Sequence, residues 1–174
     1  TLRNESINRL MLQIRNRMGA ENVEMRQTAR YIREQSTKNN TCFIGFIADQ
    51  VPTWESINHW VDFFHRDTPV FTGTEKIAKR THAALFYAHM ERVKRGHYIM
   101  RIEKFADDAA ELPDFEPTNR YYSLLAENIR RSPELWLWTH KRWKRTREGY
   151  ARREAKRIED RKRLVEREKE KGNV

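Results

Sequence analysis

Apolar residues recur at helical spacing from near the start of the chain. The positions are every third or fourth residue: Ile7, Leu10, Met11, Ile14 and Met18. This pattern predicts a first helix from about Glu5 to Met18, ended by Gly19. A second helix is expected over residues 25–35, before the polar stretch STKNNT.

The next segment, TCFIGFIADQ (residues 41–50), is apolar on both faces until its last two residues. An uninterrupted apolar run of this length predicts a buried strand and is typical of a parallel sheet covered by helices. The strand is expected to end at Asp49-Gln50, before the breaker Pro52.

Residues 53–70 carry large aromatic side chains without a clear period and predict a long loop. A short helix is expected from Phe71 to about Thr81. The segments ALFYAHMERV and HYIMRIEKF read as strands, and Lys94-Arg95-Gly96 between them predicts a hairpin.

The last third of the chain predicts helices. One is expected over residues 118–131, and Ser132-Pro133-Glu134 has the order of a capping serine, a first-turn proline and an acid that starts another. That helix would carry WLWTHKRWK (residues 136–144). The fold class is therefore α/β, a mixed sheet flanked by helices. Residues 1–147 would form the domain, and residues 148–174 a charged tail that is either a solvated helix or frayed.

The composition of the chain limits the class of partner that it is expected to bind. The 174 residues include 35 Lys/Arg and 25 Asp/Glu, a formal charge of +10, which favours an anionic partner without naming it. The single Cys42 excludes an intramolecular disulfide framework and is expected to be a packed thiol. The sequence has no apolar run of the roughly 20 residues that span a bilayer. Because a helical pattern begins almost at Thr1, we expect the chain to be a piece of a longer protein.

Three places could bind substrate. Asp49 and Gln50 would lie at the carboxyl end of a strand, where α/β sheets bind ligands, although Asp49 could simply cap a turn. The helix start Gly73-Thr74-Glu75-Lys76 could hold a phosphate, or Thr74 could only cap the helix. Arg15 and Arg17 could bind an anion, or be solvated surface residues.

On a helix, WLWTHKRWK would place Trp136, His140 and Trp143 on one face and bring Trp138 near Arg142. The tryptophans could instead pack on the sheet. The basic side chains around this segment predict a surface that faces an acidic protein or anionic lipid headgroups: Arg130, Arg131, Lys141, Arg142, Lys144 and Arg145. The histidines have no metal-ligand spacing, and neither a metal nor a cofactor is expected.

Read in order, several blocks resemble the bacterial lipid A biosynthesis (lauroyl/myristoyl) acyltransferases of the lysophospholipid acyltransferase superfamily. The blocks are IRNRMG, FIADQVP, WVDFF, FTGTEKIAKR, RGHYIMRIEK and IRRSPELWLWTHKRWK. Together they cover about residues 5–147, and the last block is the most specific.

The resemblance implies a partial α/β sandwich and an enzyme at the cytoplasmic face of the bacterial inner membrane. Such enzymes move a fatty acyl chain from acyl carrier protein, sometimes acyl-CoA, to a hydroxyl of the lipid A precursor or a related lipid. Arg17 and Arg15 match acceptor-contacting arginines, and Asp49 matches an acid near the active centre. Gly73, Thr74 and Glu75 occupy a phosphate-contacting block. Its usual order, Glu-Gly-Thr-Arg, is changed here, so phosphate contact is expected from Lys76 or the backbone rather than from Glu75.

The family's catalytic motif is His-x4-Asp/Glu, in which the histidine is the general base. The residues five places after the six histidines are not acidic: Phe64, Val70, Tyr87, Lys94, Ile102 and Arg145. We therefore expect the parent protein to be an acyltransferase and this chain alone to be inactive. Self-association over exposed apolar surface is also expected. A basic nucleic-acid-binding module and a structural assembly domain remain alternatives, but no nucleic-acid recognition motif is found.

Overall fold

The computed structural model describes residues 4–24, 27–38, 40–170 and 172. The chain divides into two units, Thr1–Gly45 and Phe46–Val174. Each unit has its own set of elements, and each is considered by itself. The predicted boundary between a domain and a tail at residues 147 and 148 stays a prediction.

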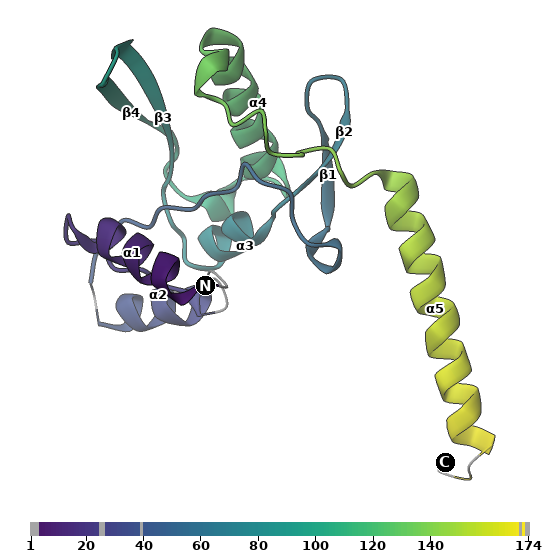
Figure 1. Cartoon of the computed structure of the whole chain (residues 1–174). Helices are drawn as coiled ribbons and strands as arrows, with labels where there is room; N and C mark the ends of the chain where they lie inside the picture. The colour runs from purple at the N-terminus through teal and green to yellow at the C-terminus, as the bar shows by residue number, and fades with distance from the viewer. Residues whose placement is uncertain (1–3, 25–26, 39, 171, 173–174) are drawn as a thin grey trace. The chain divides into compact units, whose positions relative to one another are not determined.

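The first unit contains two short helices, α1 (Glu5–Asn16) and α2 (Thr28–Thr37) (Figure 1). The Asn4 side chain caps α1 by accepting a hydrogen bond from the backbone N–H of Ile7 at 3.1 Å. Shortly after the helix, Gly19 adopts φ 80°, a conformation that glycine adopts without strain. Both predicted helices are confirmed; the expected start of the second, residue 25, lies outside the described residues.

The second unit combines helices with two antiparallel hairpins. Its regular elements, in chain order, are β1 (His59–Asp62), β2 (Asp67–Val70), α3 (Gly73–Arg80), β3 (Leu85–Lys94), β4 (His97–Ala106), α4 (Glu116–Arg131) and α5 (Arg147–Glu170). Single 3₁₀ turns cover Trp54–Ser56, Ala109–Glu111 and Pro133–Leu135. Helices with small sheets confirm the α/β class, and the expected charged tail is the helix α5.

The β1–β2 hairpin replaces part of the predicted loop over residues 53–70. Its strands pair in register from His59 opposite Val70 to Asp62 opposite Asp67. The connection places Phe64 and His65 at φ 56° and 58°, which non-glycine residues rarely adopt. The turn therefore lacks the glycine or asparagine by which such hairpins are found in sequence.

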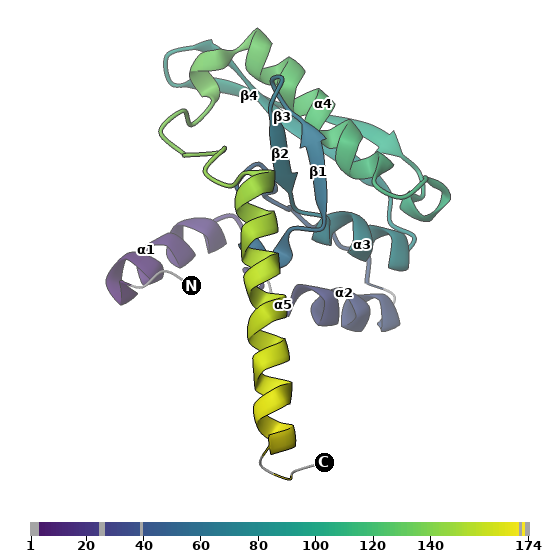
Figure 2. The same cartoon turned by 90° about the vertical axis from the view of Figure 1, so that its right-hand side faces the viewer.

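The core lies between this hairpin and α4, which are adjacent in both views (Figures 1 and 2). Val61, Phe63 and Val70 from the hairpin pack with buried residues of α4: Tyr122, Leu125, Ala126 and Ile129. Phe63 is 1% exposed. Its ring packs edge to face on that of Tyr122, with the ring centroids 5.4 Å apart. The apolar stripe predicted for this helix is confirmed.

The β3–β4 hairpin also confirms its prediction. Lys94 pairs with His97, which leaves Arg95-Gly96 as the turn, with Gly96 at φ 78°. On one face Tyr87 and His89 are buried, and Tyr87 meets Tyr121 of α4. The other face is apolar and exposed, as Met90, Met100 and Ile102 show.

The predicted strand over residues 41–50 is wrong. The structure assigns no strand to these residues, both sheets are antiparallel, and Ile47 is 80% exposed. Cys42 is likewise exposed rather than packed. An apolar extended segment becomes a strand only when a neighbouring strand receives its backbone hydrogen bonds, and sequence alone does not supply that neighbour.

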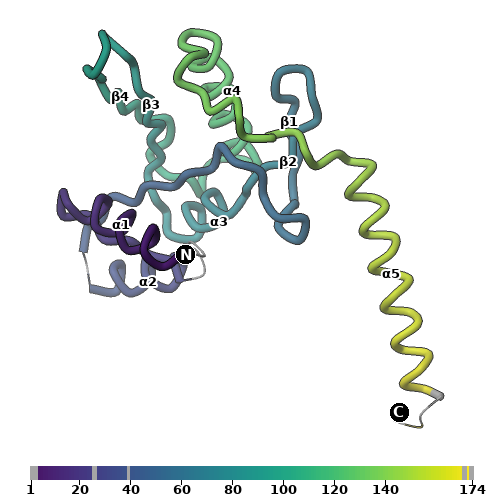
Figure 3. Tube along the Cα trace, in the orientation of Figure 1, coloured from purple at the N-terminus to yellow at the C-terminus, as the bar shows by residue number. Residues whose placement is uncertain are grey.

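The helix predicted for WLWTHKRWK is also wrong. After the 3₁₀ turn Pro133–Leu135 the chain continues through irregular turns until α5 begins at Arg147 (Figure 3). Ser132 makes no side-chain capping bond there. We call residues 136–146 the strap, because Arg142 and Trp143 among them bind the β1–β2 hairpin.

Candidate functional site

Asp49 follows Ala48, whose backbone carbonyl is bound by a tyrosine of α4. The Tyr122 hydroxyl donates a hydrogen bond of 2.7 Å to the carbonyl oxygen of Ala48. Asp49 is half-buried, and its Oδ1 is buried without a hydrogen-bond partner. A buried carboxylate oxygen without a donor is costly, so this group is expected to serve a purpose other than stability. Its neighbour Gln50 is exposed.

Arg142 binds the same tyrosine hydroxyl. The residue is only 1% exposed. Its Nη2 donates one hydrogen bond to the Pro69 carbonyl at 2.8 Å and another to the Tyr122 hydroxyl at 3.0 Å. Its Nε and Nη1 are buried without partners. The assignment of Arg142 to a carrier- or membrane-facing surface is therefore wrong, as is its pairing with Trp138. The guanidinium carbon Cζ of Arg142 lies over the Tyr122 ring instead, 5.6 Å from the ring centroid.

Both charges act on the tyrosines of α4. Burial raises the pKa of Tyr122; the positive charge of Arg142 opposes that rise and the carboxylate of Asp49 adds to it. Burial also raises the pKa of Tyr121, with smaller contributions from Tyr122 and Asp49 in the same direction. Asp49 and Arg142, 93 residues apart in sequence, therefore share one environment around Tyr122.

The strap is held across β1–β2 by its aromatic and basic side chains. Trp143 Nε1 donates to Thr68 Oγ1 at 2.9 Å, and the indole packs against Phe63. Trp136 also packs on the core, whereas Trp138 is 58% exposed. Arg145 donates to the Pro52 carbonyl and stacks on Trp54, so it is half-buried and not a free surface charge.

Glu75 has a structural role at the start of α4. Its Oε1 accepts the N–H of Phe115 at 2.7 Å, and its Oε2 accepts the N–H and hydroxyl of Thr118. These bonds occupy the carboxylate, in agreement with the expectation that Glu75 does not contact phosphate. Thr72 at the start of α3 makes no side-chain cap, and Lys76 is exposed.

The other basic residues lie at the surface. Arg130, Arg131, Lys141 and Lys144 are exposed, and Arg130 stacks over Phe64. Within the first unit, Arg15 lies in the last turn of α1 and Arg17 just after it, and both are exposed. Among the described residues, no hydrogen bond or ion pair joins Asp49 to the turn Gly73–Lys76.

Sequence reasoning missed a histidine–carboxylate pair. His82 Nδ1 lies 2.7 Å from Asp108 Oδ2, and the Asp108 Oδ1 accepts the N–H of Ala110. The hydrogen bonds from Ala110 and His82 hold the pKa of Asp108 below its ordinary value. The two residues are 26 positions apart, so no local spacing reveals the pair.

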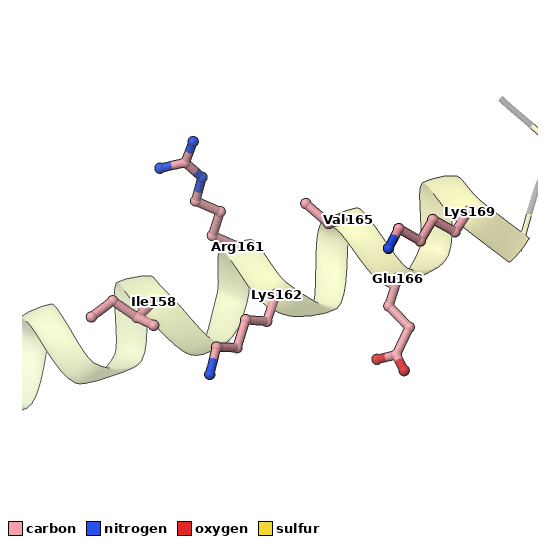
Figure 4. Close-up of a pocket in the computed structure, with 6 residues that line it drawn as sticks. All are labelled: Ile158, Arg161, Lys162, Val165, Glu166 and Lys169. Atoms are coloured by element: carbon pink, nitrogen blue, oxygen red, sulfur yellow. The ribbon is translucent and has the colours of Figure 1, made fainter. Parts of the chain in front are cut away.

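The described surface includes a cleft and an open hollow along one helix. The cleft, of about 330 Å³, is lined by residues of β1 and α4: His59, Trp60, Val61, Asp62, Asn119, Tyr122 and Ser123. The open hollow, of about 680 Å³, is lined by Ile158, Arg161, Lys162, Val165, Glu166 and Lys169. Figure 4 shows all six on one helix, so this is an open face of α5 and not an enclosed site. None of the predicted site residues lines either hollow.

Within the described ranges, no cluster of three or more His, Cys, Asp or Glu side chains could hold a metal ion. Nor does any helix in that part of the chain have the length and apolar character to cross a bilayer.

Comparison with known proteins identifies the family. A family model described as Bacterial lipid A biosynthesis acyltransferase matches residues 1–145. The chain belongs to this family. No curated protein matches it. Membership assigns acyl transfer as the general activity, and the match includes Asp49, Gly73–Lys76 and nearly all of the strap. α5 lies outside the matched residues.

Proposed function

We propose that the protein transfers a fatty acyl chain from acyl carrier protein or acyl-CoA to a hydroxyl of the lipid A precursor or a related lipid. The place of the reaction would be the cytoplasmic face of the bacterial inner membrane. One observation carries the proposal: the acyltransferase family match spans every residue of the Asp49–Tyr122–Arg142 cluster. A half-buried carboxylate and a buried guanidinium that act on the same tyrosine fit a site built for charge rather than for packing.

In the proposed reaction the acceptor hydroxyl oxygen attacks the thioester carbonyl carbon. A C–O bond forms, the C–S bond breaks, the thiol leaves, and the hydroxyl proton passes to a base. Residues 1–174 contain no His-x4-Asp/Glu motif, so we propose that this chain binds and orients the acceptor and that the base comes from elsewhere. Asp49 would help to orient the reacting groups.

The exposed cations supply the remaining contacts in this proposal. Lys76 and the N–H groups at the start of α3 would contact a phosphate of the acceptor, since Glu75 is occupied. Arg15 and Arg17 of the first unit would make further acceptor contacts. The exposed side chains Arg130, Arg131, Lys141 and Lys144 would face an acidic carrier protein or lipid headgroups.

The test is acyl transfer by the natural full-length protein, with radiolabelled acyl carrier protein and lipid A precursor. We expect labelled lipid product, and we expect Asp49→Ala to lower turnover about 100-fold, the range for loss of a charge-stabilising group. The matched control is Arg161→Ala on the exposed face of α5, which should retain full turnover. Absence of product with the unsubstituted protein would overturn the function, and equal losses in both variants would overturn the role of Asp49.

A further inference from the structure

We propose that Arg142 is a positioning residue, which acts through the Tyr122 hydroxyl to fix the Ala48–Asp49 peptide and so aims the Asp49 carboxylate. This inference rests on the proposed function. It assigns to the buried arginine of the strap a task other than contact with a carrier or a membrane.

Three hydrogen bonds define the path. Arg142 Nη2 donates to Pro69 of β2 and to the Tyr122 oxygen of α4. Because the phenol accepts from Arg142, its single proton is directed to the Ala48 carbonyl, 2.7 Å away. The residue after that carbonyl is Asp49. The orientation of the carboxylate is thus tied to the strap through one hydroxyl group.

The opposite charges of Arg142 and Asp49 explain how this buried set of hydrogen bonds is tolerated. A guanidinium that is 1% exposed loses its hydration, and here two of its three nitrogens find no hydrogen-bond partner. Asp49 Oδ1 is also buried and unpartnered, and both charges act on Tyr122. Opposite charges that face the same phenol offset part of each other's burial cost. For stability alone, an apolar side chain of similar volume would serve at position 142 as well or better.

The alternative is that Arg142 only pins β2 to the strap. Tyr122→Phe separates the two roles, because it removes the link to Ala48 and leaves the Arg142–Pro69 bond and the ring packing in place. Tyr98→Phe is the matched control: the same atom is removed from a tyrosine that is 53% exposed on β4.

In the acyl-transfer assay of the natural protein, we expect Tyr122→Phe to lower kcat about 10-fold with little change in KM, since small misplacements of a reacting group carry losses of this order. Arg142→Met should lower kcat similarly, and Arg142→Lys should recover part of it. In an Asp49→Ala background, Tyr122→Phe should have almost no further effect, because residues that act through one group are not additive. An equal loss in both backgrounds would overturn the proposal.

Hydrogen exchange gives a readout that does not depend on activity. Backbone amides in a peptide covering residues 46–52 should exchange faster in Tyr122→Phe than in the unsubstituted protein, while α4 and β3–β4 stay unchanged. Tyr98→Phe should leave the 46–52 peptide as it is. Unchanged exchange at 46–52 in Tyr122→Phe overturns the positioning role even if the enzyme is active. Absence of acyl product with faster exchange would instead overturn the proposed function and leave the mechanical link intact.

Discussion

Glu75 accepts three hydrogen bonds from the start of α4 while belonging to the first turn of α3. A helix N-terminus leaves backbone N–H groups without partners, and a carboxylate there also suits the helix dipole. The same bonds hold Phe115 at φ 65°, where its ring stacks on His59. A single acidic side chain in α3 thus binds the start of α4, where Phe115 is 40 residues further along the chain.

Glu75→Ala should therefore destabilise the fold. Loss of the buried acceptor leaves the N–H groups of Phe115 and Thr118 unsatisfied, which costs about 1–3 kcal/mol. Urea unfolding followed by circular dichroism measures the change. Glu111→Ala removes an exposed carboxylate and should change the free energy of unfolding by less than about 0.5 kcal/mol. Similar values for the two variants would show that the Glu75 bonds do not stabilise α4.

The ionisation of Asp108 predicts that the stability of the folded protein depends on pH. Its pKa is lowered first by the N–H of Ala110 and then by His82, so the folded state favours the carboxylate. The resulting stabilisation is present above the unfolded-state pKa and is lost as pH falls through the lower, folded-state pKa. Asp108→Asn keeps an oxygen acceptor for Ala110 but does not titrate. We expect the melting temperature of this variant to fall less between pH 5 and pH 2 than that of the unsubstituted protein; parallel curves would contradict the assignment.

At the scale of elements, periodic patterns predicted the structure well where local signals suffice. The apolar stripe of α4 and the Arg95-Gly96 turn each specify their element without distant contacts. The β1–β2 hairpin was missed because its turn uses Phe64 and His65 at positive φ. The strap was mistaken for a helix because Ser132-Pro133-Glu134 has the order of a helix start, whereas in the structure Trp136 and Trp143 pack on the hairpin core.

The residues of the candidate site likewise divide into one that the sequence could identify and two that it could not. Asp49 could be singled out from sequence because it ends an apolar run in FIADQVP, a block that resembles the family's sequences. Tyr122 and Arg142 could not, because their bonds connect residues 20, 73 and 74 positions apart. The charge of Arg142 even indicated the wrong environment, since basic side chains are rarely buried and its neighbours Lys141 and Lys144 are exposed.

The strap allows a matched comparison of two tryptophans. Trp143 packs against Phe63 and donates to Thr68, whereas Trp138 is exposed and its indole donates to nearby Pro133. Trp143→Ala should destabilise the protein by about 2–4 kcal/mol through lost packing and loss of the hydrogen bond to Thr68. Trp138→Ala should change stability by less than about 1 kcal/mol. Chemical denaturation of both variants gives the comparison, and a larger loss for Trp138 would contradict the strap as described.

At the scale of the whole molecule, the β3–β4 hairpin presents apolar surface that its own unit does not cover. Met90 faces Met100 across the strands, and Ile102 lies two residues further along β4, on the same face. These side chains are 43%, 60% and 52% exposed. Contiguous exposed apolar side chains on a long hairpin are typical of a contact surface or an aggregation site.

We expect a second copy of the chain to cover this face. The surface is apolar and lies on a two-stranded sheet, so two copies can bury the same side chains against each other. Met100→Lys should shift the protein toward monomer, because each association would then bury a charge. Light scattering over a concentration series measures the mass. The matched control is Leu164→Lys on α5, since Leu164 is 59% exposed but lies outside the hairpin. Monomer at every concentration in the unsubstituted chain would refute self-association, and equal dissociation by both variants would place the contact on another surface.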